Sequence, residues 1–199
     1  MSRRRLSSKI RREQLVQAAL EVLGKSGVRK LSVAAVARRV GLVPSALYRH
    51  FRSKEELLDA MPELIRERLL MNVQAAEAET DDAVGQLHRL LVRHVGIIRG
   101  DVGIPRMVFS EEFYSAHAER RKKVYEGIRA YLGAVAQMVR LGQKQGRIRR
   151  GLDAETAALM FLGIVQPAAI LWHMSDGRFD ANEHAGRAWK VFKRMLTEK

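Results

Sequence analysis

The sequence has no cysteine among its 199 residues. This absence excludes disulfide frameworks, thiolate zinc sites and cysteine nucleophiles, and it fits a reducing compartment. A long apolar run is also missing, because Gly163, Gln166 and Pro167 interrupt the longest candidate, residues 157–172. Such a segment is too short and too broken to span a bilayer. No apolar segment of a secretory signal follows the basic N-terminus. We therefore expect a soluble, cytoplasmic protein with no membrane partner.

The motifs of common enzymes are absent as well. There is no Gly-rich phosphate loop, no His-Glu-x-x-His and no serine at a nucleophile elbow. The six histidines are scattered, and His88 and His94 are six residues apart, which does not match the i, i+4 spacing of metal ligands on one helix face. We therefore expect that the protein is not an enzyme and that it has neither a metal site nor a cofactor.

Positive charge, by contrast, is in excess. The formal net charge is +14, and residues 1–60 carry 14 Lys/Arg against 5 Asp/Glu, whereas residues 61–199 carry 22 against 17. A basic N-terminal module is typical of a protein that binds a phosphate-bearing partner such as DNA. On charge alone, a solvated basic face that aids solubility remains the alternative.

Apolar residues recur at helical spacing along nearly the whole chain, and no run alternates with period two, so the sequence predicts an all-α fold. An apolar stripe from Leu15 to Leu23 predicts a first helix over about 8–25, ended by Gly27. Ser53 and Glu56 form a capping-box pattern that opens a later helix. Pro62 is expected to kink that helix or break it near Met61. Further helices are expected at about 82–99, 105–113, 117–145, 153–174 and from 181 onward.

Two short helices joined through Gly41 have the length of a helix-turn-helix. Ser32 is a good N-cap for the first of them, and Pro44 fits the first turn of the second. Leu47 and Phe51 form an inward pair at i, i+4. A helix-turn-helix places its second helix in the major groove of DNA. Any antiparallel helix pair can imitate this pattern, so it does not by itself establish the motif.

The segment from Leu31 to Leu58 resembles the N-terminal signature of the TetR family. The most specific parts are Leu47-Tyr-Arg-His-Phe51 and Ser53-Lys-Glu-Glu-Leu57. The resemblance implies a three-helix DNA-binding domain over residues 1–54, followed by a helical regulatory and dimerisation domain over residues 55–199. It also implies a transcription regulator, by family habit a repressor, that binds a double-stranded DNA operator.

The resemblance assigns roles in DNA binding to individual residues. The groove-facing positions it implies are Val43, Pro44, Ser45, Ala46, Arg49 and His50, and the implied contacts to backbone phosphates are Ser32, Tyr48 and Lys54. Where the family commonly has Ser or Thr, this chain has Val43, which weakens the helix cap by roughly 1 kcal/mol. Val43 and Ala46 would then touch thymine methyl groups, an apolar mode of readout.

A basic arm precedes the first helix and contains Arg3, Arg4 and Arg5. Two interpretations are open for this arm. It could lie in a minor groove or along phosphates, or it could be a disordered basic tail.

The last two helices look like an assembly surface. The segment 153–174 is apolar on nearly all sides and carries small residues such as Gly163, and the last helix supplies Trp189, Phe192 and Leu196. The resemblance implies a homodimer through these two helices, packed as a four-helix bundle, and hence a palindromic operator. The alternative is an ordinary intramolecular core.

A small-molecule effector is the last expectation, and it follows from the resemblance rather than from a pattern. Residues that would line its pocket are His88, His94, Phe109, Phe113, Tyr125, Phe161, Gln166 and Trp172. The simpler interpretation places the aromatic residues in the core. An architectural DNA-binding protein without a switch is the rival function, and sequence preference for DNA distinguishes the two.

Overall fold

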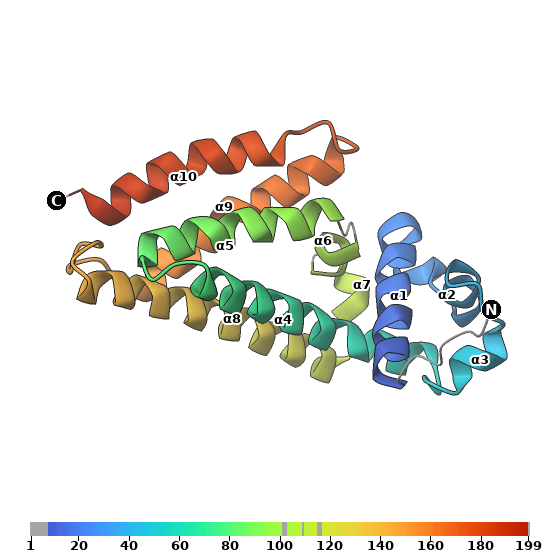
Figure 1. The fold of residues 1–199 in the computed structure, drawn as a ribbon. Coiled ribbons are helices and arrows are strands. Elements are labelled where there is room, and N and C mark those ends of the chain that lie inside the picture. The colour runs from blue at the N-terminus through green and yellow to red at the C-terminus, as the bar shows by residue number, and fades with distance from the viewer. Residues whose placement is uncertain (1–7, 101–102, 109, 115–116, 199) are drawn as a thin grey trace, which may run out of the picture. The chain divides into compact units, whose positions relative to one another are not determined.

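The computed structural model describes residues 8–100, 103–108, 110–114 and 117–198. Every regular element in these residues is an α-helix, which confirms the predicted fold class (Figure 1). In chain order the helices are α1 (Ser8–Lys30), α2 (Val33–Arg39), α3 (Pro44–Tyr48), α4 (Lys54–Ala78), α5 (Ala83–Gly100), α6 (Gly103–Val108), α7 (Glu111–Tyr114), α8 (Ala118–Lys144), α9 (Ala154–Met174) and α10 (Ala181–Thr197).

The chain forms two compact units that are not contiguous in sequence. Met1–Ile65 joins Asp101–Tyr125 in the first, which we call the reader unit. Arg66–Gly100 joins Glu126–Lys199 in the second, which we call the body unit. Helices α4 and α8 therefore each contribute to both units. The domain boundary expected between residues 54 and 55 stays a prediction, but the segment 101–125 belongs spatially with the reader unit.

Helix α1 provides the core of the reader unit. Leu15, Ala19, Leu20 and Leu23 are fully buried on its inner face. Gly27 adopts a φ of +78°, and it interrupts the helical backbone before the element ends at Lys30. The predicted stop at Gly27 therefore marks a kink, with one further turn after it. Helix α6 packs on α1 within the same unit.

Helix α4 does not break at Pro62. It is one continuous helix from Lys54 to Ala78 with Pro62 inside it, so the predicted break near Met61 is wrong. Leu57 and Met61 are fully buried and Leu58 nearly so. Burial of this apolar face stabilises the helix and offsets the loss of the backbone hydrogen bond that Pro62 cannot donate. A second difference lies at 105–113, where the sequence predicted one helix and the described residues form two, α6 and α7.

The body unit has a core formed by the second half of α4 with α5, α8, α9 and α10. Phe161 of α9 and Phe192 of α10 pack edge to face with ring centroids 5.8 Å apart. Helix α9 is the one helix in the described residues that is long and apolar enough to cross a membrane by length and composition. Its inner residues Phe161, Val165 and Ala168 are buried in this core, as in a core helix of a globular unit.

Candidate nucleic-acid interface

Helices α2 and α3 form a helix-turn-helix whose turn is closed by backbone hydrogen bonds. Ser32 caps α2, since its side chain accepts from the N–H of Ala35 at 3.1 Å. At the other end, the N–H of Leu42 reaches the carbonyl of Ala37 at 2.9 Å, and Gly41 has a φ of +68°. This is the Schellman arrangement, which needs a left-handed residue and so favours glycine. The turn is therefore encoded locally.

Buried and exposed residues divide cleanly along α3. Leu47 and Phe51 are fully buried, as predicted for the inward pair. Val43 is 63% exposed and Tyr48 53% exposed. The other positions assigned to the groove are also open to solvent: Pro44, Ser45 and Arg49 are exposed, and Ala46 and His50 are partly so. The side of α3 that faces away from the core is thus exposed, and it is free to enter a groove of DNA.

The first turn of α3 has no side-chain cap. Val43 occupies the cap position with an extended backbone, and Pro44 follows at the start of the helix. This arrangement matches the expectation from the missing Ser or Thr. The exposed Val43 side chain is available for apolar contact instead.

The C-terminal end of α3 is held by Arg12 of α1, a role that the sequence did not reveal. The Arg12 guanidinium donates to the His50 carbonyl and to Glu56 at 3.3 Å, and it lies 4.1 Å from the Phe51 ring centroid. Glu56 also accepts from the N–H of Arg52 at 2.7 Å. This hydrogen bond, with the nearby Arg12, lowers the pKa of the Glu56 carboxyl below its usual value. Arg12 of α1 therefore holds the C-terminal end of α3, the second helix of the helix-turn-helix, which we call the recognition helix.

Only one of the two hydrogen bonds of a capping box is present at the start of α4. The N–H of Glu56 donates to Ser53 Oγ at 3.1 Å, but the Glu56 side chain reaches Arg52 rather than Ser53. Beside it, Lys54 Nζ donates to the Val28 carbonyl at 3.0 Å. The ammonium group expected at a DNA phosphate thus ties α4 to the end of α1 in this structure. The basic arm with Arg3, Arg4 and Arg5 lies outside the described residues.

A buried cation lies on the other side of α4. Arg120 of α8 is 1% exposed, and it donates to Glu55 and to Asp59, each at 2.8 Å. It also donates to the Phe113 carbonyl at 3.2 Å and lies over the Phe113 ring. We call these four residues the Arg120 cluster. It joins α7 and the start of α8 to the first two turns of α4.

The residues expected to bind an effector lie in both units. Phe113 belongs to the Arg120 cluster in the reader unit, and Tyr125, 60% exposed, is the last residue of the same unit. Phe109 lies outside the described residues. The remaining five belong to the body unit, on α5 and α9: His88, His94, Phe161, Gln166 and Trp172.

His94 is the most deeply placed polar residue of that set. Its Nδ1 lies 2.8 Å from the Tyr131 hydroxyl, inside the apolar core of the body unit. Burial lowers the pKa of His94 to about 4 and raises that of Tyr131. His88, by contrast, stacks on Trp189 with ring centroids 4.8 Å apart and is exposed. The two histidines therefore differ in environment, and only His94 faces the interior.

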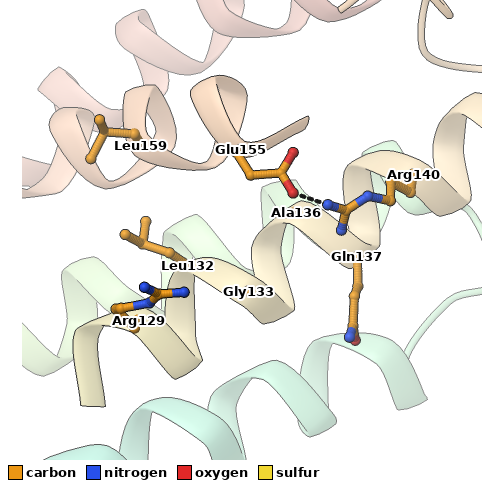
Figure 2. A pocket seen from close by; sticks show the side chains of 8 residues that line it. All are labelled: Arg129, Leu132, Gly133, Ala136, Gln137, Arg140, Glu155 and Leu159. Carbon is orange, nitrogen blue, oxygen red and sulfur yellow. Dashed lines mark hydrogen bonds and ion pairs between the residues drawn. The ribbon is translucent and has the colours of Figure 1, made fainter. Parts of the chain in front are cut away.

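A surface groove of about 400 Å³ lies between α8 and α9 (Figure 2). Its lining combines the cations Arg129 and Arg140 with Gln137, Glu155 and the small or apolar residues Leu132, Gly133, Ala136 and Leu159. Arg140 forms an ion pair with Glu155 across it. None of the residues predicted to bind an effector lines this groove. Among the described residues, no group of three or more His, Cys, Asp or Glu is placed to hold a metal ion.

A basic helix-turn-helix with an outward-facing recognition helix defines a DNA-binding protein, and the family comparison agrees. Residues 15–61 match the family model described as bacterial regulatory proteins of the tetR family. Residues 80–196, more than half of the chain, match the model described as the tetracyclin repressor-like C-terminal domain. The chain belongs to the TetR family of DNA-binding transcription regulators. This membership confirms the resemblance and the expectation that the protein is not an enzyme.

Individual relatives resemble the chain over nearly its whole length. The fatty acid metabolism regulator protein of Bacillus subtilis is 25% identical over 170 residues, which cover 84% of this chain and 86% of that protein. A nucleoid occlusion factor SlmA from Idiomarina loihiensis is 22% identical, with 94% and 95% covered.

Among solved structures, the fatty acid degradation regulator FadR from Bacillus halodurans is 20% identical with a TM-score of 0.80, covering 96% of this chain and 97% of that one. FadR from Bacillus subtilis, solved in complex with stearoyl-CoA, is 23% identical with a TM-score of 0.74, covering 92% and 98%. At this identity the structural likeness supports the fold.

Proposed function

We propose that the protein is a homodimeric repressor that occupies a palindromic operator and releases it when a small molecule binds the body unit. The observation that carries the proposal is the outward face of α3, where Val43, Tyr48 and their neighbours are exposed while Leu47 and Phe51 hold the helix to the core. Repression follows the habit of the family to which the chain belongs. Such a protein acts in the cytoplasm, where the DNA is.

The proposed DNA contacts are those assigned from the family signature. Val43, Pro44, Ser45, Ala46, Arg49 and His50 meet base edges, and Ser32, Tyr48 and Lys54 meet phosphates. Ser32 keeps a hydroxyl hydrogen for a phosphate while its oxygen caps α2. Lys54 has two further N–H groups besides the one directed at Val28. The arm with Arg3, Arg4 and Arg5 would add contacts outside the major groove.

An uncovered apolar stripe on α9 supports the homodimer. Leu159 is 61% exposed and Met174 76% exposed, and Met160, Ile170 and Leu171 between them are also exposed. Gly163 and Pro167 lie on the same side and allow a second helix to approach closely. Contiguous apolar surface of this kind marks an interaction site. A twofold pairing through α9 and α10 would give two readers and a palindromic site.

For the effector, we propose an acyl-CoA thioester as the first class to test. The support is the likeness to a fatty acid metabolism regulator and to a structure solved with stearoyl-CoA. The apolar core of the body unit contains the His94–Tyr131 pair as polar groups that a ligand could engage. Both residues titrate far from neutral pH, so neither would carry a charge when a neutral acyl chain enters.

The test is a titration against DNA by fluorescence anisotropy. Purified protein is mixed with DNA from upstream of its own gene and with a scrambled control at several salt concentrations. A specific regulator binds the first about a thousandfold more tightly, with a steep salt dependence. Addition of stearoyl-CoA then lowers the affinity, whereas free coenzyme A does not. Equal binding to both DNAs would favour an architectural protein and end the repressor proposal.

Val43→Ser tests apolar readout at the recognition helix. The variant gains a cap for α3, worth about 1 kcal/mol, but no longer touches a thymine methyl group. We expect a fold at least as stable and an operator affinity that falls or changes its base preference at one position. Unchanged preference and affinity would contradict readout by Val43.

A further inference from the structure

The groove between α8 and α9 lies wholly within the body unit and has no role in the proposed function (Figure 2). Its volume of about 400 Å³ falls within the range of pockets that hold small molecules, about 300–1,000 Å³. Neither His94 nor Tyr131, the buried polar pair of the core, lines it. A ligand in this groove would therefore occupy a different site from an effector held in the core.

Small residues of α8 leave space in the middle of the groove. Gly133 is exposed, and a Cβ atom there would meet nothing within 4 Å. Ala136, one turn further along, is 2% exposed and belongs to the core, so it forms the floor. Leu132, which is partly buried, and Leu159 of α9, which is exposed, add apolar surface. The middle of the groove can therefore accept an apolar group without a shift of the backbone.

The two ends of the groove differ in charge. Arg129 and Arg140 lie on the same side of α8, about three turns or 16 Å apart along its axis. Arg140 is paired with Glu155 of α9. Arg129 is exposed, and it has no hydrogen bond or ion pair within the part of the chain that the structure describes. Two arginines against one glutamate leave the lining with a net charge of +1, located at the Arg129 end.

This combination of charge and apolar surface fits a monoanion with an apolar chain. A guanidinium presents parallel N–H groups that match the two oxygens of a carboxylate. One carboxylate neutralises the lining, whereas a phosphate monoester, with close to two charges at neutral pH, would leave excess negative charge near Glu155. A chain attached to a carboxylate at Arg129 can lie over Gly133 and Ala136 and contact Leu159.

We propose that the groove between α8 and α9 binds a monocarboxylate with an apolar chain, the carboxylate on Arg129 and the chain over Gly133 and Ala136. The inference goes beyond the proposed function, because it requires neither an operator nor a ligand in the core. Failure of the repressor proposal would leave it unaffected, and its own failure would leave the repressor proposal unaffected.

The experiment is a calorimetric titration of the full chain with sodium decanoate. Decanol has the same chain without a charge, and decyl phosphate carries about one charge more. We expect one saturable site per chain for decanoate and weaker binding of both comparison ligands. Arg129→Gln should weaken decanoate binding about tenfold, because a charge-assisted hydrogen bond is lost. Arg129→Lys should recover part of that loss, since it keeps the charge but not the planar fork.

A second set of variants tests the position of the chain. Gly133→Leu places a side chain in the open space of the groove, so the fold should be retained and decanoate binding lost. Gly96→Leu on α5 and Arg147→Gln after α8 are the matched controls, because they change exposed positions of the body unit outside the groove. Both should bind decanoate like wild type. Glu155→Gln releases Arg140 from its ion pair, so it should strengthen decyl phosphate binding more than decanoate binding.

Several outcomes would overturn the inference. No saturable binding of decanoate, or equal binding of decanol, means that the groove has no site for an anion. Tighter binding of decyl phosphate by wild type would contradict the carboxylate. Unchanged affinity of Gly133→Leu places decanoate elsewhere, for example in the core. Unchanged affinity of Arg129→Gln, or an equal loss in Arg147→Gln, excludes a head group held by Arg129. A lower mass of Gly133→Leu than of wild type in sedimentation would assign the groove to contact between two copies of the chain.

Discussion

At the scale of single residues, the protein places two polar groups where their environment controls their chemistry. His94 is buried in the apolar core with the Tyr131 hydroxyl as its hydrogen-bond partner. Arg120 is buried in the reader unit, with two carboxylates, a carbonyl and an aromatic ring around it. Burial disfavours a charge on His94, which has a neutral partner, whereas the two carboxylates offset the cost of burying the Arg120 guanidinium.

His94 should make folding sensitive to acid. In the unfolded chain its pKa is near 6.5, whereas burial lowers the folded value to about 4. The unfolded state therefore takes up a proton first as pH falls, and stability is lost between about pH 6.5 and 4. The full loss is about 3 kcal/mol for this group. Urea unfolding of wild type and His94→Gln across this range measures it, since the glutamine keeps a hydrogen-bonding group but does not titrate. Parallel pH profiles would contradict the assignment.

The Arg120 cluster should respond unequally to removal of its two halves. In E55Q/D59N the buried guanidinium keeps its charge without a carboxylate, which costs about 3 kcal/mol or more. In R120M the carboxylates of Glu55 and Asp59, 49% and 43% exposed, can be hydrated. The free energy of unfolding should therefore fall by only about 1–2 kcal/mol. Chemical denaturation of both variants tests the order. A more severe effect of R120M would mean that packing, not charge, is the main contribution of Arg120.

At the scale of secondary structure elements, close approach between helices fixes the reader unit. A Cβ atom on Gly103 would lie 2.1 Å from the Leu20 carbonyl oxygen, which is far inside van der Waals distance. Helix α6 therefore sits on the backbone of α1 through this glycine, and a side chain there must separate the two helices.

Gly103→Ala should destabilise the protein by about 1–3 kcal/mol, as overpacking does. Gly96→Ala on α5 is the matched control, because a Cβ atom there meets nothing within 4 Å. In an open helical position alanine is better than glycine by up to about 1 kcal/mol. Thermal unfolding should thus move the two variants in opposite directions. Equal shifts would show that α6 can yield without loss of stability.

At the scale of the whole molecule, the homodimer that we propose depends on the exposed apolar stripe of α9. Ile170→Glu would bury a carboxylate in the proposed interface, which an apolar surface does not tolerate. Val92→Glu on α5 is the control, since Val92 is 59% exposed and outside the stripe. Sedimentation should give twice the 22.6 kDa chain mass for wild type and Val92→Glu, and the single mass for Ile170→Glu. If the Ile170→Glu protein is still a dimer, the interface does not include this stripe of α9.

The sequence by itself determined the features that depend on local chemistry. The cap at Ser32, the turn at Gly41 and the inward pair Leu47 and Phe51 all lie where periodicity and capping preferences predicted them. The family signature, which is a local pattern too, led to the same class of regulator as the comparisons. DNA contacts and effector residues remain predictions that only binding experiments decide.

Only the tertiary structure decided the rest, because it depends on residues far apart in sequence. Pro62 leaves α4 continuous since the neighbouring apolar face is buried. Arg120 looks like one more surface cation in a basic run, and only the fold brings Glu55 and Asp59, more than sixty residues away, within 2.8 Å. The segment 101–125 joins the reader unit for the same reason. Long-range burial and pairing energies, unlike caps and turns, leave no local pattern from which to predict them.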